Sequence, residues 1–316
     1  MLHLRVVVPD ELVDDVLELL NSEPAACNLI HLPGAARKPD GDVILVDLAR
    51  EDASVVLADL RELKVDRHGS IAVEEVDFQL SEHMERVVEI APGSPADAVV
   101  WEEVTARTSE TAELSWSFVL FMVLAGLIAT VGILLDSPIL IVGAMVVGPE
   151  FGPIAGFAVA LVQRRPDLAL RSFGALAVGF PLAIGLVAVA TLVFKGIDVT
   201  PEDFDAASHS LSGTIARPDF FSFFVAFCAG VAGVLSLTAA KSGALIGVLI
   251  SVTTIPAAAN IGVAAAYGEW SAARGSFEQL ALNVAALLAA GTLTLATGRA
   301  LYARRRSRHK RQRVRR

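Results

Sequence analysis

Residues 141–162, IVGAMVVGPEFGPIAGFAVALV, have the length and composition of a transmembrane helix but contain features that interrupt one. A bilayer core requires about 20 apolar residues in a helix. Pro149 and Pro153 carry no amide hydrogen, so backbone carbonyls near the middle of this span lose their hydrogen-bond donors. Lipid does not tolerate such groups, which must contact protein or line a watery cavity. The stretch predicts a membrane helix with a functional break, or a kink satisfied by hydroxyl side chains.

Glu150 lies between the two prolines, about a dozen residues from either end of the span. A charged side chain there costs on the order of 3 kcal/mol on insertion scales. We expect it to face the bundle interior, either protonated or paired. Because basic residues in the proposed spans occur near span ends (Arg171, Lys241 and Arg299), a proton or cation role is favoured over an ion pair.

The same span carries Gly148, Gly152 and Gly156, one every four residues. Such a ridge of small residues lets a second helix approach closely, and this packing role is favoured over a backbone-lined pore.

A second span, 248–264 (VLISVTTIPAAANIGVA), repeats the interruption, since Pro256 leaves the carbonyl of Val252 without a donor. Matched interruptions in two halves of a chain point to a transport site, whereas a pair of simple kinks is the plainer alternative. The polar side chains of this span suit a small polar substrate or ion, or hydrogen bonds between helices. The candidate pathway residues are Gly148, Pro149, Glu150, Gly152, Pro153, Thr253, Thr254, Pro256 and Asn260.

We place six spans at 115–135, 138–162, 170–194, 220–240, 243–267 and 278–299. Segments of the first three align with the last three at a shift of 104–105 residues, as in SFVLFMVLAGL from Ser117 and SFFVAFCAGVAG from Ser222. A unit of three spans begins and ends on opposite sides of the membrane, so a second copy that follows it starts from the other side and has the opposite orientation. The alignment therefore predicts an inverted repeat, unless two helix triplets rich in Ala, Gly and Val align by chance.

Charge is distributed unevenly along the chain. Residues 1–113 hold 25 acidic and 9 basic side chains, a net of −16, and the remainder holds 10 and 17, a net of +7. The basic segment 163–167, Lys241 and the tail fall on one side of the membrane, and the acidic loop 195–219 on the other. Since basic loops stay inside and the start shows no signal peptide, we expect a cell-membrane protein with both termini cytoplasmic. The tail is expected to lie disordered against anionic lipid headgroups.

The N-terminal region reads as a soluble domain. Strand-like segments at 2–8, 25–31, 43–48 and 70–79 and helical segments at 10–20 and 51–63 follow the order β-α-β-β-α-β, which predicts a ferredoxin-like sandwich with an exposed loop around Pro33-Gly34 and Pro39-Asp40-Gly41. Its acidity excludes electrostatic binding of nucleic acid. The expected domains are 1–80 (ferredoxin-like), 81–114 (acidic linker helix), 115–303 (six-helix bundle) and 304–316 (basic tail).

Three motifs carry a resemblance to a known family. Residues 137–161 (SPILIVGAMVVGPEFGPIAGFAVAL), 242–264 (SGALIGVLISVTTIPAAANIGVA) and 279–295 (QLALNVAALLAAGTLTL) resemble, in this order, the DUF389 family of hydrophobic bacterial and archaeal membrane proteins. The resemblance implies a membrane protein without an established activity.

Three function classes compete. The first is a transporter or channel for a small ion or polar solute, with its site between spans two and five and a cytosolic regulatory domain. The second is a membrane-anchored sensor or scaffold whose bundle serves oligomerisation and whose soluble domain binds a ligand or partner. The third, an intramembrane enzyme, is disfavoured because the spans hold no paired nucleophile and base and no metal-ligand set. We expect no cofactor and no metal, and we expect a homo-oligomer.

Overall fold

The computed structural model describes residues 1–76, 81–82, 86, 99–200, 209–238 and 254–313. The chain forms two compact units, the first made mainly of residues 1–104 and the second mainly of residues 105–305.

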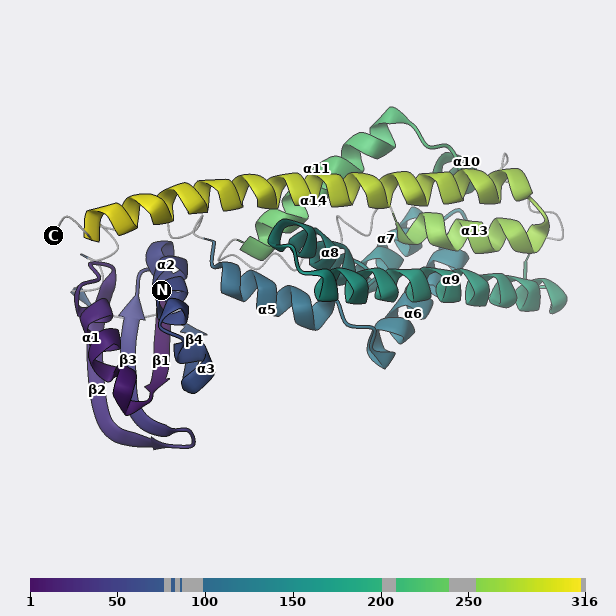
Figure 1. Cartoon of the computed structure of the whole chain (residues 1–316). Helices are drawn as coiled ribbons and strands as arrows, with labels where there is room; N and C mark the ends of the chain where they lie inside the picture. Colours follow the sequence, from purple (N-terminus) through teal and green to yellow (C-terminus); the bar gives the residue numbers. More distant parts are fainter. Residues whose placement is uncertain (77–80, 83–85, 87–98, 201–208, 239–253, 314–316) are drawn as a thin grey trace. The chain divides into compact units, whose positions relative to one another are not determined.

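The first unit is a four-stranded antiparallel sheet in the order β2-β3-β1-β4, with helices packed on one face (Figure 1). Alternate residues of β1 and β3 face the helices, and Leu4, Val6, Ile44 and Val46 are fully buried there. This alternation follows from the period of two along a strand. The predicted element order is confirmed. The elements are β1 (Leu2–Val8), η1 (Asp10–Leu12), α1 (Val13–Asn21), β2 (Ala26–Arg37), β3 (Asp40–Leu48), α2 (Arg50–Glu62), α3 (Val65–His68) and β4 (Ser70–Glu75).

The loop predicted around Pro33 and Gly34 is wrong, because both residues lie within β2. A register shift between Leu32 and Ala36 accommodates them in the strand. Gly34 adopts a left-handed φ of 59°, and its amide donates to the Asp42 carboxylate at 2.8 Å. A side-chain acceptor on β3 thus replaces a regular ladder bond.

The second unit is helical and strongly apolar. Among the described residues, four helices are long and apolar enough to cross a membrane, and the bent pair α7 and α8 raises the number to five if it is one span. Large apolar side chains point outward from these helices, with Ile139 83% and Leu170 73% exposed, as expected of lipid-facing positions. The helices are α5 (Trp101–Thr111), α6 (Trp116–Leu134), α7 (Pro138–Val147), α8 (Phe151–Gln163), α9 (Pro166–Gly196), α10 (Ser210–Ile215), α11 (Phe220–Thr238), α13 (Ile255–Tyr267) and α14 (Trp270–Arg313).

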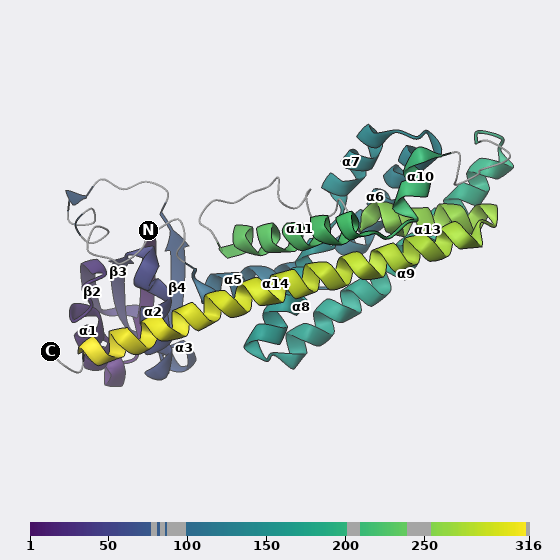
Figure 2. The ribbon, with the colours of Figure 1, turned by 90° about the horizontal axis from the view of Figure 1, so that it is seen from above.

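The predicted spans one to four and six correspond to long helices or to the bent pair. The predicted fifth span is represented by α13, while its first half falls outside the described residues. Inside the unit, α13 runs beside α9 and contacts α6, as can be followed in Figure 2. The expected disorder of the tail is wrong as far as Arg313, because α14 continues to that residue. Arginine is a good helix former, so the basic run extends the helix.

Helix boundaries in this unit recur at a constant interval. Helices α6 and α11 both have 19 residues and begin at 116 and 220, and α8 and α13 both have 13 residues and begin at 151 and 255. Helices α9 and α14 begin at 166 and 270. Each pair of starts is 104 residues apart, which agrees with the shift of 104–105 residues at which the two halves of the sequence align.

Candidate functional site

The break in the second predicted span lies at Gly148, Pro149 and Glu150. Helix α7 ends at Val147 and α8 begins at Phe151, with a bend of 53° between them. Gly148 is extended, at φ −62° and ψ 125°, and Glu150 is the N-cap residue of α8. The predicted break at Pro149 is therefore confirmed. Pro153 lies in the first turn of α8, where backbone amides need no partner within the helix, so it causes no second interruption.

The second interruption is described on its C-terminal side. Helix α13 begins at Ile255, with Pro256 in its first turn and Thr254 as its N-cap residue. A proline in this position fits the start of a helix, because its fixed φ is already helical and its missing amide would have had no partner. Thr253, which the sequence placed in the pathway, lies outside the described residues, as does the Val252 carbonyl that Pro256 was predicted to leave without a donor.

The two helix starts meet through their N-cap residues. The Thr254 hydroxyl donates to Glu150 Oε1 at 2.6 Å, and both residues are fully buried. The sequence indicated Glu150 and Thr254 as candidate pathway residues of two different spans, and the structure brings these two side chains together. A carboxyl group deep in an apolar bundle thus has a hydroxyl partner from the other half of the chain.

Asn260, one of the predicted pathway residues, belongs to a separate polar cluster. The Ser212 hydroxyl donates to Asn260 Oδ1 at 2.8 Å, and the Asn260 amide donates to Ser276 Oγ at 2.8 Å and to the Ser212 carbonyl at 3.3 Å. All three side chains are fully buried. Ser212 and Ser276 were missed by sequence reasoning, because a serine carries no signal of burial. These hydrogen bonds tie α10, α13 and α14 together.

Two of the three glycines of the ridge, Gly152 and Gly156, make close contacts with neighbouring segments. A Cβ atom at Gly152 would lie 2.6 Å from the Thr111 carbonyl oxygen, and one at Gly156 would lie 2.8 Å from both Ala112 Cβ and Ser172 Oγ. The close approach predicted for this ridge therefore occurs at these two positions, and its partners are α5 with the residue that follows it, and α9. Gln163 adds a polar contact, donating to Thr105 Oγ1 at 2.7 Å.

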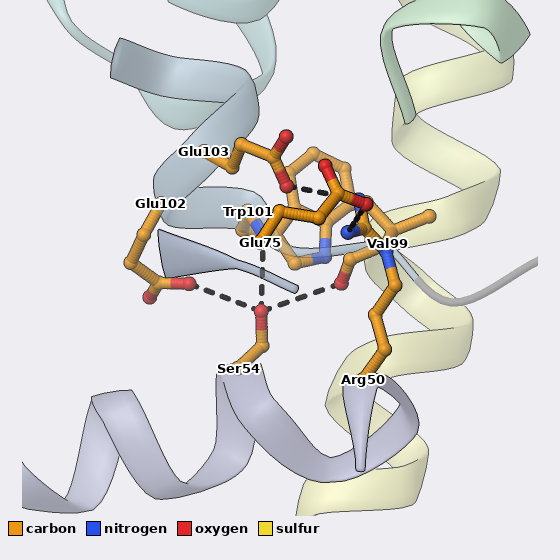
Figure 3. A network of polar contacts seen from close by, with 7 residues as sticks. All are labelled: Arg50, Ser54, Glu75, Val99, Trp101, Glu102 and Glu103. Carbon is orange, nitrogen blue, oxygen red and sulfur yellow. Dashed lines mark hydrogen bonds and ion pairs between the residues drawn. The ribbon is translucent and has the colours of Figure 1, made fainter. Parts of the chain in front are cut away.

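The beginning of α5 is held by a polar network on α2 of the first unit (Figure 3). Arg50, only 3% exposed, donates to Glu75 at 2.8 Å and to Glu103 at 2.9 Å. The Ser54 hydroxyl accepts from the Trp101 amide at 3.0 Å and lies 3.0 Å from the Glu102 carboxylate. Sequence reasoning did not single out Arg50 or Ser54. Their positions on a helix face toward α5 give these ordinary residue types a positioning role.

A small apolar cavity lies near the break, between α8, α11 and α14. Phe151, Ile154, Gly230 and Leu287 are among the residues that line it, and Glu150 is not. The predicted water-filled cavity open to Glu150 is therefore not seen among the described residues, which enclose its side chain. In the same part of the chain, no group of three or more His, Cys, Asp or Glu side chains is placed to hold a metal ion.

Comparison with known proteins finds a family model that matches the part of the chain that contains this site. The family model described as domain of unknown function DUF389 matches residues 145–289, which confirms the resemblance carried by the three motifs. The uncharacterized protein MJ0678 of Methanocaldococcus jannaschii is 28% identical over 185 residues, or 55% of this chain and 52% of that protein. The chain thus spans about half the length of this relative. No solved structure matches the chain.

Proposed function

We propose that the protein is a membrane transporter or channel for a small ion or polar solute, with its site where the broken helices two and five meet. The observation that carries this proposal is the hydrogen bond between Thr254 and Glu150, which joins the starts of α8 and α13 at a fully buried position. Broken helices whose ends meet inside a bundle are a recurrent way of building transport sites.

The constant interval of 104 residues between helix starts supports an arrangement of two halves. In the proposed arrangement each half crosses the membrane three times, so the second half is inverted relative to the first. Both termini then lie in the cytoplasm, in agreement with the positive charge of the 163–167 loop and of the tail. An inverted repeat supplies the two similar gates that alternating access requires.

The chemistry of Glu150 favours a functional role over packing. A purely structural hydrogen bond at this place is available from Ser, Thr or Asn, whose transfer into an apolar interior costs far less than that of a carboxylate. Neighbouring positions already use such neutral groups, as Asn260 and Ser276 do. An ionisable group is therefore an expensive choice, and it is explained if the group binds a proton or cation during transport.

The soluble domain is proposed to regulate transport through α5. The first turn of α5 forms hydrogen bonds with Arg50 and Ser54 of α2. Its last turn lies against Gly152 of α8, two residues after Glu150. In this proposal, α5 is the connection between the soluble domain and the broken span.

The test is a flux assay with the full-length protein in proteoliposomes. We expect the wild-type protein to move at least one probe of a panel containing rubidium, sodium, chloride and small neutral and zwitterionic solutes. Glu150→Gln keeps the shape of the side chain and removes its charge, so the variant is expected to fold normally and to lose at least about 90% of this flux. Unchanged flux in Glu150→Gln would overturn the role of this site.

The enclosure of Glu150 among the described residues favours a second candidate, in which the bundle is an anchor and an oligomerisation element and the soluble domain binds the ligand or partner. Transport accommodates the same observation as an occluded state, closed to both sides. The flux assay separates the two: an anchor moves none of the probes. The anchor candidate also predicts that Glu150→Gln, in residues 141–162, does not change the binding of the ligand or partner by the soluble domain.

A further inference from the structure

Packing contacts in the second unit are exchanged between positions 104 residues apart. A Cβ at Gly262 would lie 2.7 Å from Val187 Cγ1, which marks a direct contact between α13 and α9. The positions 104 residues away are Ala158 and Gly291, and a Cβ at Gly291 would lie 3.6 Å from Ala158 Cβ. The contact between α13 and α9 thus recurs between α8 and α14, with the two halves exchanged.

Contacts inside each half recur as well. A Cβ at Gly126 would lie 3.9 Å from Ala183 Cβ, and a Cβ at the equivalent Gly230 would lie 2.8 Å from the carbonyl oxygen of Leu287, which is equivalent to Ala183. Likewise, Asn260 contacts Ser276, and a Cβ at the equivalent Gly156 would lie 2.8 Å from the equivalent Ser172. A two-fold rotation carries the first half onto the second and the second half back onto the first, so it preserves the contacts inside each half and exchanges the contacts between the halves. A translation would carry the first half onto the second but would not carry the second half back onto the first.

Glu150 and Thr254 are themselves 104 residues apart and touch each other at 2.6 Å. Two equivalent residues that contact one another lie beside the rotation axis, because the rotation carries each onto the place of the other. In an inverted repeat this axis lies in the plane of the membrane. We propose that the pseudo-two-fold axis passes between Glu150 and Thr254, and that the proton is the ion this site carries from one side to the other. The proposal rests on the transport function proposed above.

The contact has the geometry of a hydrogen bond to a carboxyl group. An O–H···O⁻ hydrogen bond has an oxygen separation of about 2.5–2.7 Å, and the contact between Thr254 and Glu150 falls in this range. A proton needs a single carboxyl group, and the axis supplies one because Glu150 has a threonine as its equivalent.

Among the side chains that the structure describes, Glu150 supplies the carboxyl group at this axis. Helices α6, α7, α8 and α13 contain no Asp, Glu, Lys, Arg or His within their bounds. In α9 the charged residues lie near the two ends and are exposed, and in α5 Glu110 is exposed. Lys241 lies outside the described residues. The charged residues of the packed helices are Glu102, Glu103, Arg107 and Glu110 of α5, Asp167, Arg171 and Lys195 of α9, and Arg274 and Glu278 at the start of α14.

A group on the axis is related in the same way to both faces of the membrane. Exchange of the conformations of the two halves then exposes the same carboxyl first to one side and afterwards to the other. Protonation on one side and release on the other requires no movement of Glu150 relative to Thr254. The test must therefore measure access from each side and its dependence on Glu150.

The experiment uses Thr254→Cys in the full-length protein, with Cys27 and Cys228 replaced by Ser. A membrane-impermeant maleimide is applied to right-side-out and to inside-out vesicles between pH 5.5 and 8.5. Because thiol reactivity changes equally on both sides, the ratio of the two labelling rates at each pH reports access alone. Ala257→Cys, one turn further on the same face of α13, serves as a second reporter if Thr254→Cys does not fold.

We expect labelling from both sides, with a ratio that changes at least about tenfold over this pH range, and a ratio independent of pH when Glu150→Gln is added. Labelling from both sides with the same pH dependence in Glu150→Gln, or with none in either protein, would overturn the proton assignment and leave transport at this site intact. A change of the ratio with sodium at constant pH would likewise assign the site to a metal cation. Labelling of neither reporter from one of the two sides would overturn the site itself.

Discussion

Asn260 and Glu150 illustrate two ways of keeping a polar side chain inside an apolar bundle. The Asn260 amide uses both its donor and its acceptor, with serine hydroxyls from two other helices. Such interhelical bonds contribute about 0.6 kcal/mol on average in membrane proteins, so the cluster acts as a modest fastening. Glu150 accepts a hydrogen bond from the Thr254 hydroxyl at the opposite helix start and carries a titratable group. The difference in chemistry separates a packing cluster from a candidate transport site.

Asp42 offers a titration test in the soluble domain. The Gly34 amide at 2.8 Å and His31 Nε2 at 2.6 Å stabilise the Asp42 carboxylate and hold its pKa below the ordinary value of 3.8. A lowered pKa in the folded state adds stability that is present above about pH 4 and is lost as the pH falls through the folded-state pKa. We expect Asp42→Asn to increase amide hydrogen exchange in β2 and β3 of the full-length protein at pH 6.

The difference between wild type and Asp42→Asn should shrink as the pH is lowered to 3, with the two proteins compared at each pH. Asp40→Asn, at an exposed position two residues earlier, is the matched control and should exchange like the wild type. A difference that stays constant down to pH 3 would show that the Asp42 carboxylate does not contribute in this way.

At the scale of elements, the fit between α5 and α8 depends on glycine at two positions. The Gly156 site has no room for a methyl group, because Ala112 Cβ and Ser172 Oγ would both lie 2.8 Å from it. We expect Gly156→Ala to push α5 away from α8 and to lower the free energy of unfolding by about 1–3 kcal/mol, as overpacking does. Thermal unfolding in detergent measures this, together with flux, which should fall as the contact between α5 and the broken span is lost.

Gly174→Ala in α9 is the control for this prediction. A Cβ at Gly174 meets no heavy atom within 4 Å, and alanine is the better helix former, by about 1 kcal/mol. This variant is expected to be as stable as the wild type or slightly more stable. If Gly156→Ala and Gly174→Ala unfold at the same temperature, the glycines of α8 are not required for close packing.

The elements that could be predicted from sequence are those with a periodic or covalent signal. The strand-like segments at β1 and β3, the apolar length of α6 and the missing amide of Pro149 each predicted their structure correctly. Pro33 and Gly34 were assigned to a loop because local turn propensity does not reveal the register shift that keeps them in β2. Arg50 and Ser212 carry no local signal at all, since their roles arise from helices brought together by tertiary packing.

At the scale of the whole molecule, the 104-residue interval connects sequence, packing and proposed mechanism. It agrees within one residue with the sequence alignment of Ser117 and Ser222, which are 105 residues apart, and it recurs in the helix starts and separates Glu150 from Thr254. Because each half is proposed to contain three spans, the same interval also dictates the orientation of the chain. The loop that joins the halves and the C-terminal tail must then face opposite sides of the membrane.

This orientation is tested by labelling single cysteines at Ser210 and Ser307 in a chain with Cys27 and Cys228 replaced by Ser. Ser210 is exposed at the start of α10, in the acidic segment between the halves, and Ser307 lies in the basic end of α14. Positive charge is retained on the cytoplasmic side, so an impermeant maleimide should label Ser210→Cys in intact cells and Ser307→Cys only in inside-out vesicles. Two residues on the same side of the membrane are separated by an even number of crossings. In this proposal, Ser210 and Ser307 are separated by the three crossings of the second half, which are α11, the span that ends in α13, and α14. Labelling of both from one side would therefore remove one crossing from the second half, and with it both the inverted repeat and the axis between Glu150 and Thr254.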